Sequence, residues 1–365
     1  MLLKFSVKNF RGFVDKIELD LSNPKEYEFN KYAIKDGIIK NGIIYGPNGS
    51  GKTNLGYAIF DIVNHLTQKY SDNEYYKNFI FAGNSFGSVN FEYAFKFNDR
   101  LVNYCYSKNE RGFLLTERLL VNNEEIFYRG EKDLIICDEY NIEESIKKSF
   151  SDSVNNASIL NFIYTVYPLK EDHYISKLLK FVNSMLLFRN VDRRSFIGLD
   201  TNRTILGEYI ITNNLVKEFS SFLKSVSNQD INFIEHNKND TVLLCQVGDN
   251  TIPFDLYAST GTMALELLFY WMHRMKDTSF VFIDEFDAFF HFKLAFEVCK
   301  SLFQLDCQVF LSSHNTFLMT NDLLRPDCNF IIDKNEINSL CDCTEKELRF
   351  GHNIEKLFRG GTFNL

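Results

Sequence analysis

An eight-residue loop, Gly46-Pro-Asn-Gly-Ser-Gly-Lys-Thr53, constrains this chain more than any other feature, because it has the pattern G-x4-G-K-[ST]. A β-branched run at residues 38–45 precedes the loop, and residues 54–70 carry apolar side chains at helical spacing. In the order strand, glycine loop, helix, backbone N–H groups and a helix N-terminus hold a phosphate group. We therefore predict an α/β protein with a nucleotide site at this loop.

The residue types in the loop suggest what each position does. Glycines keep side chains out of the path of a β-phosphate, and Lys52 supplies a mobile positive charge to the β- and γ-phosphates. The hydroxyl of Thr53 is expected to bind Mg²⁺. The expected ligands are thus ATP and Mg²⁺. The expected nucleotide-binding residues are Gly46, Pro47, Asn48, Gly49, Ser50, Gly51, Lys52, Thr53 and Asn54.

A second motif is an apolar run that ends in two acids, Phe280-Val-Phe-Ile-Asp284-Glu285. The four apolar residues indicate a buried central strand, which places Asp284 at the strand end to hold Mg²⁺. Glu285 is then positioned to polarise the attacking water as a general base. Such a run is common by itself, but together with the upstream phosphate loop it indicates a site that hydrolyses ATP.

Two further segments complete the candidate site. His314 follows the next predicted strand, 308–312, and is positioned to sense a γ-phosphate; a polar loop residue is the alternative. A run of small residues opens a predicted helix, where free N–H groups bind anions. A simple Ser or Thr N-cap is the alternative there. The members of this run are Ser259, Thr260, Gly261 and Thr262.

Alternating apolar and polar residues predict several strands. The alternation at 2–13 and 17–21 predicts a hairpin, and the runs at 89–97, 101–107 and 113–121 predict an antiparallel sheet beside the nucleotide core.

Between residues 132 and 230 the apolar spacing becomes helical, as at 175–187 and 215–226, and we interpret this span as a helical insertion. Beyond it, β and α segments alternate, which predicts a mostly parallel sheet covered by helices. The expected organisation is an N-terminal lobe of the core at 1–131, a helical insertion at 132–230 and a C-terminal lobe at 231–365.

The charge balance bears on the class of partner. The chain has 40 Lys and Arg against 48 Asp and Glu, a formal net charge of -8. Duplex binding draws its affinity from cations that neutralise phosphates, so this chain gains no overall attraction to DNA. A local basic group consists of Arg189, Arg193, Arg194 and Arg203, with a solvated face as the alternative.

Nothing in the sequence indicates export or a membrane. Lys4, Lys8 and Arg11 interrupt the first residues, and no run approaches the ~20 apolar residues that a membrane span requires. The eight cysteines are scattered and are expected to be reduced thiols. We expect a cytoplasmic protein with no membrane partner.

As a set, these motifs resemble those of the ABC-type ATPases of the SMC/RecF/OLD group, and especially the compact bacterial AAA-like ATP-binding proteins of phage-defence, or abortive-infection, systems. The resemblance lies in KNFRGF, GPNGSGKT, the signature-like STGT, FIDEFDAFFH and SSHN. It covers residues 1–70 and 250–320. It implies an ABC-type P-loop core with an antiparallel β subdomain and a helical insertion.

The resemblance also implies a mechanism. Two copies enclose ATP head to tail, and the signature of one copy, with Ser259 and Gly261, caps the nucleotide held by the phosphate loop of the other. Asp287 falls at the position of the D-loop, which crosses the dimer interface. ATP closes the pair and hydrolysis reopens it.

One element of the group is missing. ABC proteins carry a glutamine between phosphate loop and signature that binds magnesium, and neither Gln68, Gln229 nor Gln246 is a convincing candidate. The magnesium shell is therefore not fully assigned by the sequence.

Three functions are compatible with these features. The first is an ATP-gated switch subunit, a homodimer or higher homo-oligomer that controls a separate nuclease or toxin effector in anti-phage defence. The second is a RecF-like repair or recombination ATPase that binds DNA across the dimer, so nucleic acid stays an open partner. The third, a non-hydrolysing scaffold, does not account for Glu285.

Overall fold

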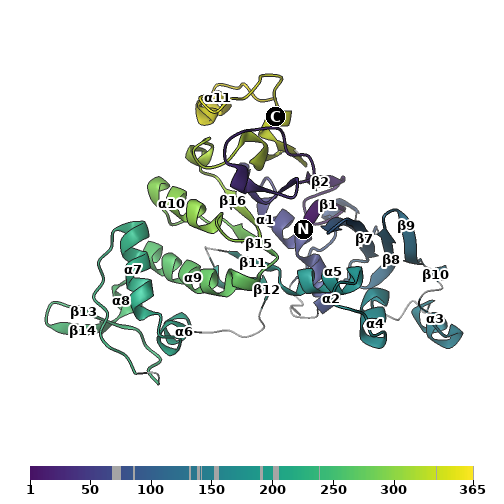
Figure 1. Cartoon of the computed structure of the whole chain (residues 1–365), viewed down its shortest axis with the longest axis horizontal. Coiled ribbons are helices and arrows are strands. Elements are labelled where there is room, and N and C mark those ends of the chain that lie inside the picture. Colours follow the sequence, from purple (N-terminus) through teal and green to yellow (C-terminus); the bar gives the residue numbers. More distant parts are fainter. Residues whose placement is uncertain are drawn as a thin grey trace.

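The computed structural model describes most of the chain (Figure 1). The described residues are 1–67, 75–84, 87–130, 133–137, 140, 142–151, 156–189, 192–199, 205–237, 239–333 and 335–364. They form two seven-stranded sheets, one antiparallel and one mainly parallel, that share a continuous hydrophobic core. This is the predicted α/β class, with the predicted antiparallel subdomain beside the nucleotide core.

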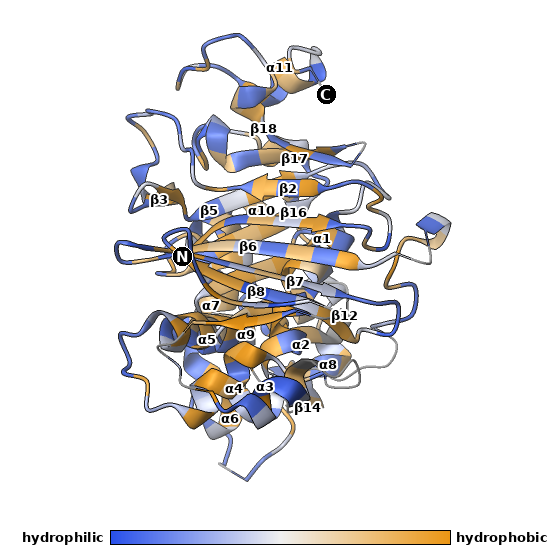
Figure 2. Cartoon of the chain, turned by 90° about the vertical axis from the view of Figure 1, so that its right-hand side faces the viewer, coloured by the Kyte–Doolittle hydropathy of each residue, from blue (hydrophilic) through white to orange (hydrophobic). Residues whose placement is uncertain are grey.

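The antiparallel sheet has the order β10-β9-β8-β7-β6-β1-β2. Its strands are β1 (Leu2–Lys8), β2 (Ile17–Asp20), β6 (Val89–Phe97), β7 (Arg100–Lys108), β8 (Leu114–Val121), β9 (Glu124–Arg129) and β10 (Leu134–Ile136). Along most of β6 buried residues alternate with more exposed ones, because successive side chains of a strand point to opposite faces (Figure 2). The predicted hairpin and the three predicted strands are confirmed, whereas β9 and β10 were not predicted.

The second sheet has the order β12-β11-β15-β16-β5-β17-β18. Its strands are β5 (Asn41–Tyr45), β11 (Leu186–Arg189), β12 (Asp192–Gly198), β15 (Phe280–Asp284), β16 (Gln308–Ser313), β17 (Asn329–Asp333) and β18 (Glu336–Ser339). The five inner strands run parallel, and only the two edge strands pair antiparallel. Every residue of β5, β15 and β16 is buried, as expected for strands covered on both faces.

Helices cover both sheets. They are α1 (Lys52–Ile59), α2 (Asp61–Thr67), α3 (Glu144–Ser151), α4 (Ile159–Val166), α5 (Tyr174–Asn183), α6 (Leu206–Thr212), α7 (Val216–Ser227), α8 (Phe254–Tyr257), α9 (Thr260–Arg274), α10 (Phe292–Leu302) and α11 (Ile354–Arg359). Two further strand pairs are β3 (Ile34–Lys35) with β4 (Ile38–Ile39), and β13 (Leu244–Val247) with β14 (Asn250–Pro253). Helix α5 packs against α2, α4 and β6, and α1 packs on β15 (Figures 1 and 2). Within the described parts of the chain, no helix is both long and apolar enough to span a membrane.

The predicted helical insertion is interrupted by two strands. The predicted helix 175–187 ends at Asn183, and β11 begins at Leu186. A short apolar run has the same pattern in a buried strand as in a helix, and here pairing with β15 decides for the strand. The polar stretches at 152–156 and 200–203 predict turns, and except for Asn156 they lie outside the described residues.

The antiparallel sheet is joined to the phosphate-loop region by a buried ion pair. Asp61 opens α2, directly after α1, and its carboxylate accepts hydrogen bonds from Lys108 Nζ (2.6 Å), Tyr106 Oη (2.8 Å) and Tyr75 Oη (3.0 Å). Neither Asp61 nor Lys108 is exposed by more than 3% at its side chain. Burial lowers the pKa of Lys108, although the negative charge of Asp61 opposes this shift. The pair therefore fixes α2 to β7 inside the core.

We predict that Lys108→Met destabilises the protein by about 3–5 kcal/mol, because the carboxylate of Asp61 would stay buried without its cation. Urea unfolding followed by circular dichroism measures this change. Lys31→Met is the matched control: its partner Glu28 is almost fully exposed, so solvent screens the pair and its loss should change stability little. Equal losses in the two variants would contradict a structural role for the buried pair.

Candidate functional site

The carboxyl ends of neighbouring parallel strands bring the sequence motifs together. The phosphate loop follows β5, the acids follow β15, and His314 follows β16. These strands are consecutive in the sheet, in the order β15-β16-β5, so their C-terminal ends meet at one edge. Ligands of open α/β sheets bind at this edge. The structure therefore gathers the three motifs in one place.

The phosphate loop leaves the start of α1 without a side-chain cap. The N-cap is Gly51, with φ of 104°, and no side chain accepts a hydrogen bond from the first turn. A side chain at Gly51 would be strained at this φ, and its Cβ would lie 2.6 Å from the ring of Phe13, in the opening segment. Backbone N–H groups at an uncapped helix start fit a phosphate group.

Lys52 is folded back onto the loop. Its Nζ donates to the carbonyl oxygens of Gly46 (2.7 Å) and Pro47 (3.0 Å). Burial lowers its pKa, although the acids Asp284 and Glu285 oppose the shift. A cation whose nearest partners are carbonyl oxygens has a stronger partner in an anionic phosphate.

The other expected loop residues are placed as follows. Pro47, Asn48 and Gly49 are exposed, and the amide of Asn54 lies beside Gly12. The hydroxyl oxygen of Ser50 is buried and has no hydrogen-bond partner in the structure. An orphaned polar atom in this loop is consistent with a missing polar ligand.

Asp284 is the most connected acid of the site. It is 1% exposed, and its Oδ2 accepts a hydrogen bond from Thr53 Oγ1 (2.8 Å) while Oδ1 accepts one from Ser312 Oγ (2.6 Å). A carboxylate beside a hydroxyl is the oxygen set that Mg²⁺ takes in nucleotide sites. Thr53 and Asp284 are thus fitted to hold the cation.

Glu285 adopts a backbone conformation that is rare for a residue with a side chain. Its φ is 50°, in the left-handed region, and its N–H donates to Ser312 Oγ (2.8 Å). Such strain is found at functional sites, where surrounding contacts hold it. The turn leaves the carboxylate of Glu285 about a third exposed, within reach of a bound water.

His314 and Asp287 flank this cluster. His314 is exposed, and its Nδ1 lies 3.4 Å from Lys52 Nζ. Asp287 is partly buried and accepts a hydrogen bond from Ser313 Oγ (2.7 Å). Burial raises the pKa of Asp287. The expected sensor, His314, therefore directly follows β16, and the expected D-loop residue, Asp287, contacts the last residue of that strand.

Sequence reasoning missed one member of the site, Arg189, which it assigned to a basic surface group. In the structure Arg189 ends β11 directly opposite Asp284 of β15, and its side chain is only 26% exposed. The guanidinium donates to Asp284 Oδ2 (3.1 Å) and to Glu285 Oε2 (3.4 Å). A solvated face is therefore wrong for Arg189. The side chains of Arg193 and Arg194, and all of Arg203, lie outside the described residues.

Of the three glutamines considered from the sequence, the structure describes Gln229 and Gln246, whose side chains bond to Thr262 and Thr251. Gln68 lies outside the described residues. Gln229 accepts a hydrogen bond from Thr262 Oγ1 (2.9 Å), and Gln246 accepts one from Thr251 on the β13–β14 hairpin. At the strand end beside Asp284, the expected magnesium ligand, the polar side chain is that of Arg189.

The signature segment forms the start of α9. Ser259 is its N-cap and accepts a hydrogen bond from the Thr262 N–H (3.2 Å). The alternative interpretation of this run, a Ser N-cap, is therefore present in the structure. Ser259 and Thr260 are exposed, whereas Thr262 is buried. A Cβ on Gly261 would lie 3.1 Å from the carbonyl oxygen of Phe289, just beyond the D-loop. In Figure 1 α8, directly before the signature, lies well to the side of α1.

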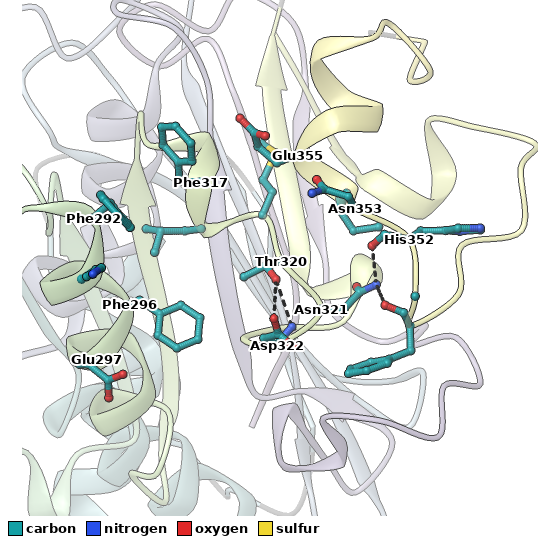
Figure 3. A pocket seen from close by; sticks show the side chains of 16 residues that line it. Phe292, Phe296, Glu297, Phe317, Thr320, Asn321, Asp322, His352, Asn353 and Glu355 are labelled. Carbon is teal, nitrogen blue, oxygen red and sulfur yellow. Dashed lines mark hydrogen bonds between the residues drawn. The ribbon is translucent and has the colours of Figure 1, made fainter.

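A separate groove of about 680 Å³ lies between α10, the turn after His314 and the C-terminal segment (Figure 3). Phe292, Phe296 and Phe317 line one side, and Asn353 and Glu355 lie across from them (Figure 3). None of the phosphate-loop residues or catalytic acids lines it. The candidate nucleotide site, which the positions of the sequence motifs define, is therefore separate from this groove.

The sequence matches, over residues 43–320, the family described as "AAA domain, putative AbiEii toxin, Type IV TA system". The match spans well over half of the chain. The chain belongs to this family. The expected resemblance to compact AAA-like ATP-binding proteins is thereby confirmed, while no curated protein matches the sequence.

Several solved structures share the fold weakly. The SMC head domain from Thermotoga maritima has 16% identity, with 90% of this chain and 94% of that chain covered and a TM-score of 0.44. The Smc head domain with an extended coiled coil bound to the C-terminal domain of ScpA, derived from Pyrococcus furiosus, has 13% identity, 92% and 95% coverage and a TM-score of 0.44. The recombination mediator protein RecF-ATPrS of the RecFOR pathway has 15% identity, 93% and 98% coverage and a TM-score of 0.40.

We predict that Lys52→Ala weakens ATP binding by at least about 30-fold, because charge-assisted hydrogen bonds contribute about 1.5–3 kcal/mol each. Equilibrium binding of a fluorescent ATP analogue measures the change. Lys16→Ala, on the exposed part of the antiparallel sheet, serves as the control and should bind as the wild type does. Unchanged affinity in Lys52→Ala would remove the phosphate-loop assignment.

Proposed function

We propose that this chain is an ATP-binding and ATP-hydrolysing switch subunit that closes as a head-to-tail pair around two ATP molecules and controls a separate effector. The observation that carries the hydrolytic part is the contact between Thr53 and Asp284. Two segments far apart in sequence meet there to make one magnesium-type oxygen pair, beside the unusual backbone of Glu285.

Each residue of the site has a proposed task. The N–H groups of the loop and Lys52 hold the phosphates, and Thr53 and Asp284 hold Mg²⁺, which neutralises the charge that develops on them. Glu285 orients and deprotonates the attacking water. His314, next to Lys52, contacts the γ-phosphate and so distinguishes ATP from ADP.

Exposure of the signature supports closure between two copies. Ser259 and Thr260 are open to solvent, and Gly261 lies against the backbone beyond Asp287, so signature and D-loop form one continuous surface. In Figure 1 α8, directly before the signature, lies to the side of α1, which follows the phosphate loop of the same copy. A second copy can therefore bring this surface to the first copy's nucleotide, as the family resemblance implies.

The family description supports a partner effector. It describes this domain as that of a putative AbiEii toxin in a Type IV TA system. That description supports a role in a defence system. The control of a separate nuclease or toxin by the ATP-driven pair rests on the resemblance of the sequence motifs.

A RecF-like ATPase that binds DNA across the dimer is the alternative function. Arg189 was the first member of the basic group that favoured it, and in the structure this side chain is bound to Asp284 and Glu285. The described residues of that group therefore offer no cation to DNA. The switch subunit is the function that we carry forward.

We predict that Glu285→Gln keeps ATP affinity but lowers turnover by about 10²–10⁴-fold, the range over which general bases act. The nucleotide then persists and an ATP-bound dimer accumulates, which light scattering detects. Glu124→Gln, exposed on β9, is the control. Wild-type turnover in Glu285→Gln would exclude it as the base.

We further predict that Ser259→Arg leaves ATP binding by a single subunit intact but blocks dimer closure, because a long cation replaces the small residue that faces the partner's phosphate. Light scattering of an ATP-loaded Ser259→Arg, Glu285→Gln double variant reports closure. Ser221→Arg, exposed on α7, controls for the added charge. Normal association of the double variant with ATP would refute capping by the signature.

A further inference from the structure

Arg189 reaches the catalytic acids because of where β11 lies in the sheet. β11 is the parallel neighbour of β15, and the register pairs Arg189 with Asp284. The three preceding residues, Leu186 to Phe188, are buried, so the strand is fixed by its core packing. The guanidinium at its end is thus held at the acids and is not a chance surface contact.

The guanidinium covers the carboxylate oxygen that a divalent cation requires. Arg189 Nε lies 3.1 Å from Asp284 Oδ2, the same oxygen that accepts a hydrogen bond from Thr53 Oγ1 at 2.8 Å. Mg²⁺ takes oxygen ligands at about 2.0–2.1 Å in strict octahedral geometry, and a positive group bonded to the same oxygen repels it. The cation and the bound guanidinium therefore compete for Asp284.

In this arrangement both cations of the site are bound to protein groups. Lys52 is bound to loop carbonyls, and Arg189 spans Asp284 and Glu285. The site thus contains two positively charged side chains beside two negatively charged ones. Arg189 also holds the oxygen of the general base. A triphosphate offers both cations anionic partners, and Arg and Lys form their strongest hydrogen bonds with such groups.

From this geometry, and resting on the proposed ATP site, we propose that Arg189 is a positioning residue that latches the nucleotide-free site. It excludes Mg²⁺ from Asp284 and holds Glu285 until a triphosphate draws the guanidinium away. Like the glutamine that the family resemblance implies, Arg189 lies between phosphate loop and signature in the sequence, but unlike a neutral amide it opposes the metal. The site consequently assembles its metal only together with the nucleotide.

The test is a Mg²⁺ titration of the binding of N-methylanthraniloyl-ATP, followed by fluorescence, with the full-length chain. For Arg189→Gln the Mg²⁺ concentration at half-maximal binding should fall by about tenfold, which corresponds to about 1.4 kcal/mol of lost competition. Arg189→Lys keeps the charge but cannot span both acids, and should fall by a smaller factor. Arg118→Gln removes a comparable arginine, paired with Glu125 on the antiparallel sheet, and should titrate as the wild type does.

A purely structural role of Arg189 would lower the melting temperature and weaken nucleotide binding equally at every Mg²⁺ concentration, without moving the midpoint. A midpoint for Arg189→Gln equal to that of Arg118→Gln overturns the latch. If Arg189→Gln does not fold, a midpoint for Arg189→Lys equal to that of the wild type overturns it in the same way. A wild-type chain that binds no nucleotide at any Mg²⁺ concentration overturns the proposed ATP site and the latch with it.

Discussion

The nucleotide site depends on one buried carboxylate, that of Asp284. It accepts hydrogen bonds from Ser312 on β16, from Thr53 on α1 and from Arg189 on β11. Three neighbouring elements are therefore tied to the end of β15 through a single side chain. A buried acid with this many donors is stable only while they remain in place, because each unpaired buried polar group carries a desolvation penalty. The same side chain therefore positions the residues of the proposed nucleotide site and ties neighbouring elements of the sheet together.

The sequence predicted the parts of the site in which a local pattern coincides with a motif. The phosphate loop lies between a β-branched run and a helical one, and the acids end an apolar run, so their places followed from periodicity and order. The strand β11 was not predicted, because its three apolar residues and one charged residue continue the apolar spacing of the preceding helix. Only the pairing of Leu186 to Arg189 with β15, which depends on the tertiary structure, shows that this segment is a strand. A signal was nevertheless present: Met185 to Arg189 is an apolar run that ends in a charged residue, as Phe280 to Asp284 is.

Contacts between distant segments explain the rest of what the sequence could not give. Asp61 and Lys108 are 47 residues apart, and nothing in either local sequence indicates that they pair. Gln308 on β16 likewise bonds the backbone of Leu2 on β1 and of Ile39 through one buried amide. The first link joins helix α2 to the antiparallel sheet, and the second joins that sheet to the parallel one. The sheet that begins the chain is therefore structurally continuous with the strand that leads to His314.

The position of β5 has a consequence for biosynthesis. The strand that leads to the phosphate loop, Asn41–Tyr45, is flanked in the finished sheet by β16 and β17, which are translated more than 250 residues later. Until then both of its hydrogen-bonding edges, and the apolar side chains of Ile43 and Ile44, lack their partners in the sheet. Unpaired apolar strands of this kind are prone to association with other chains, and non-local pairing is slow. Nascent copies of this protein should accordingly depend on chaperones until β16 and β17 have been translated.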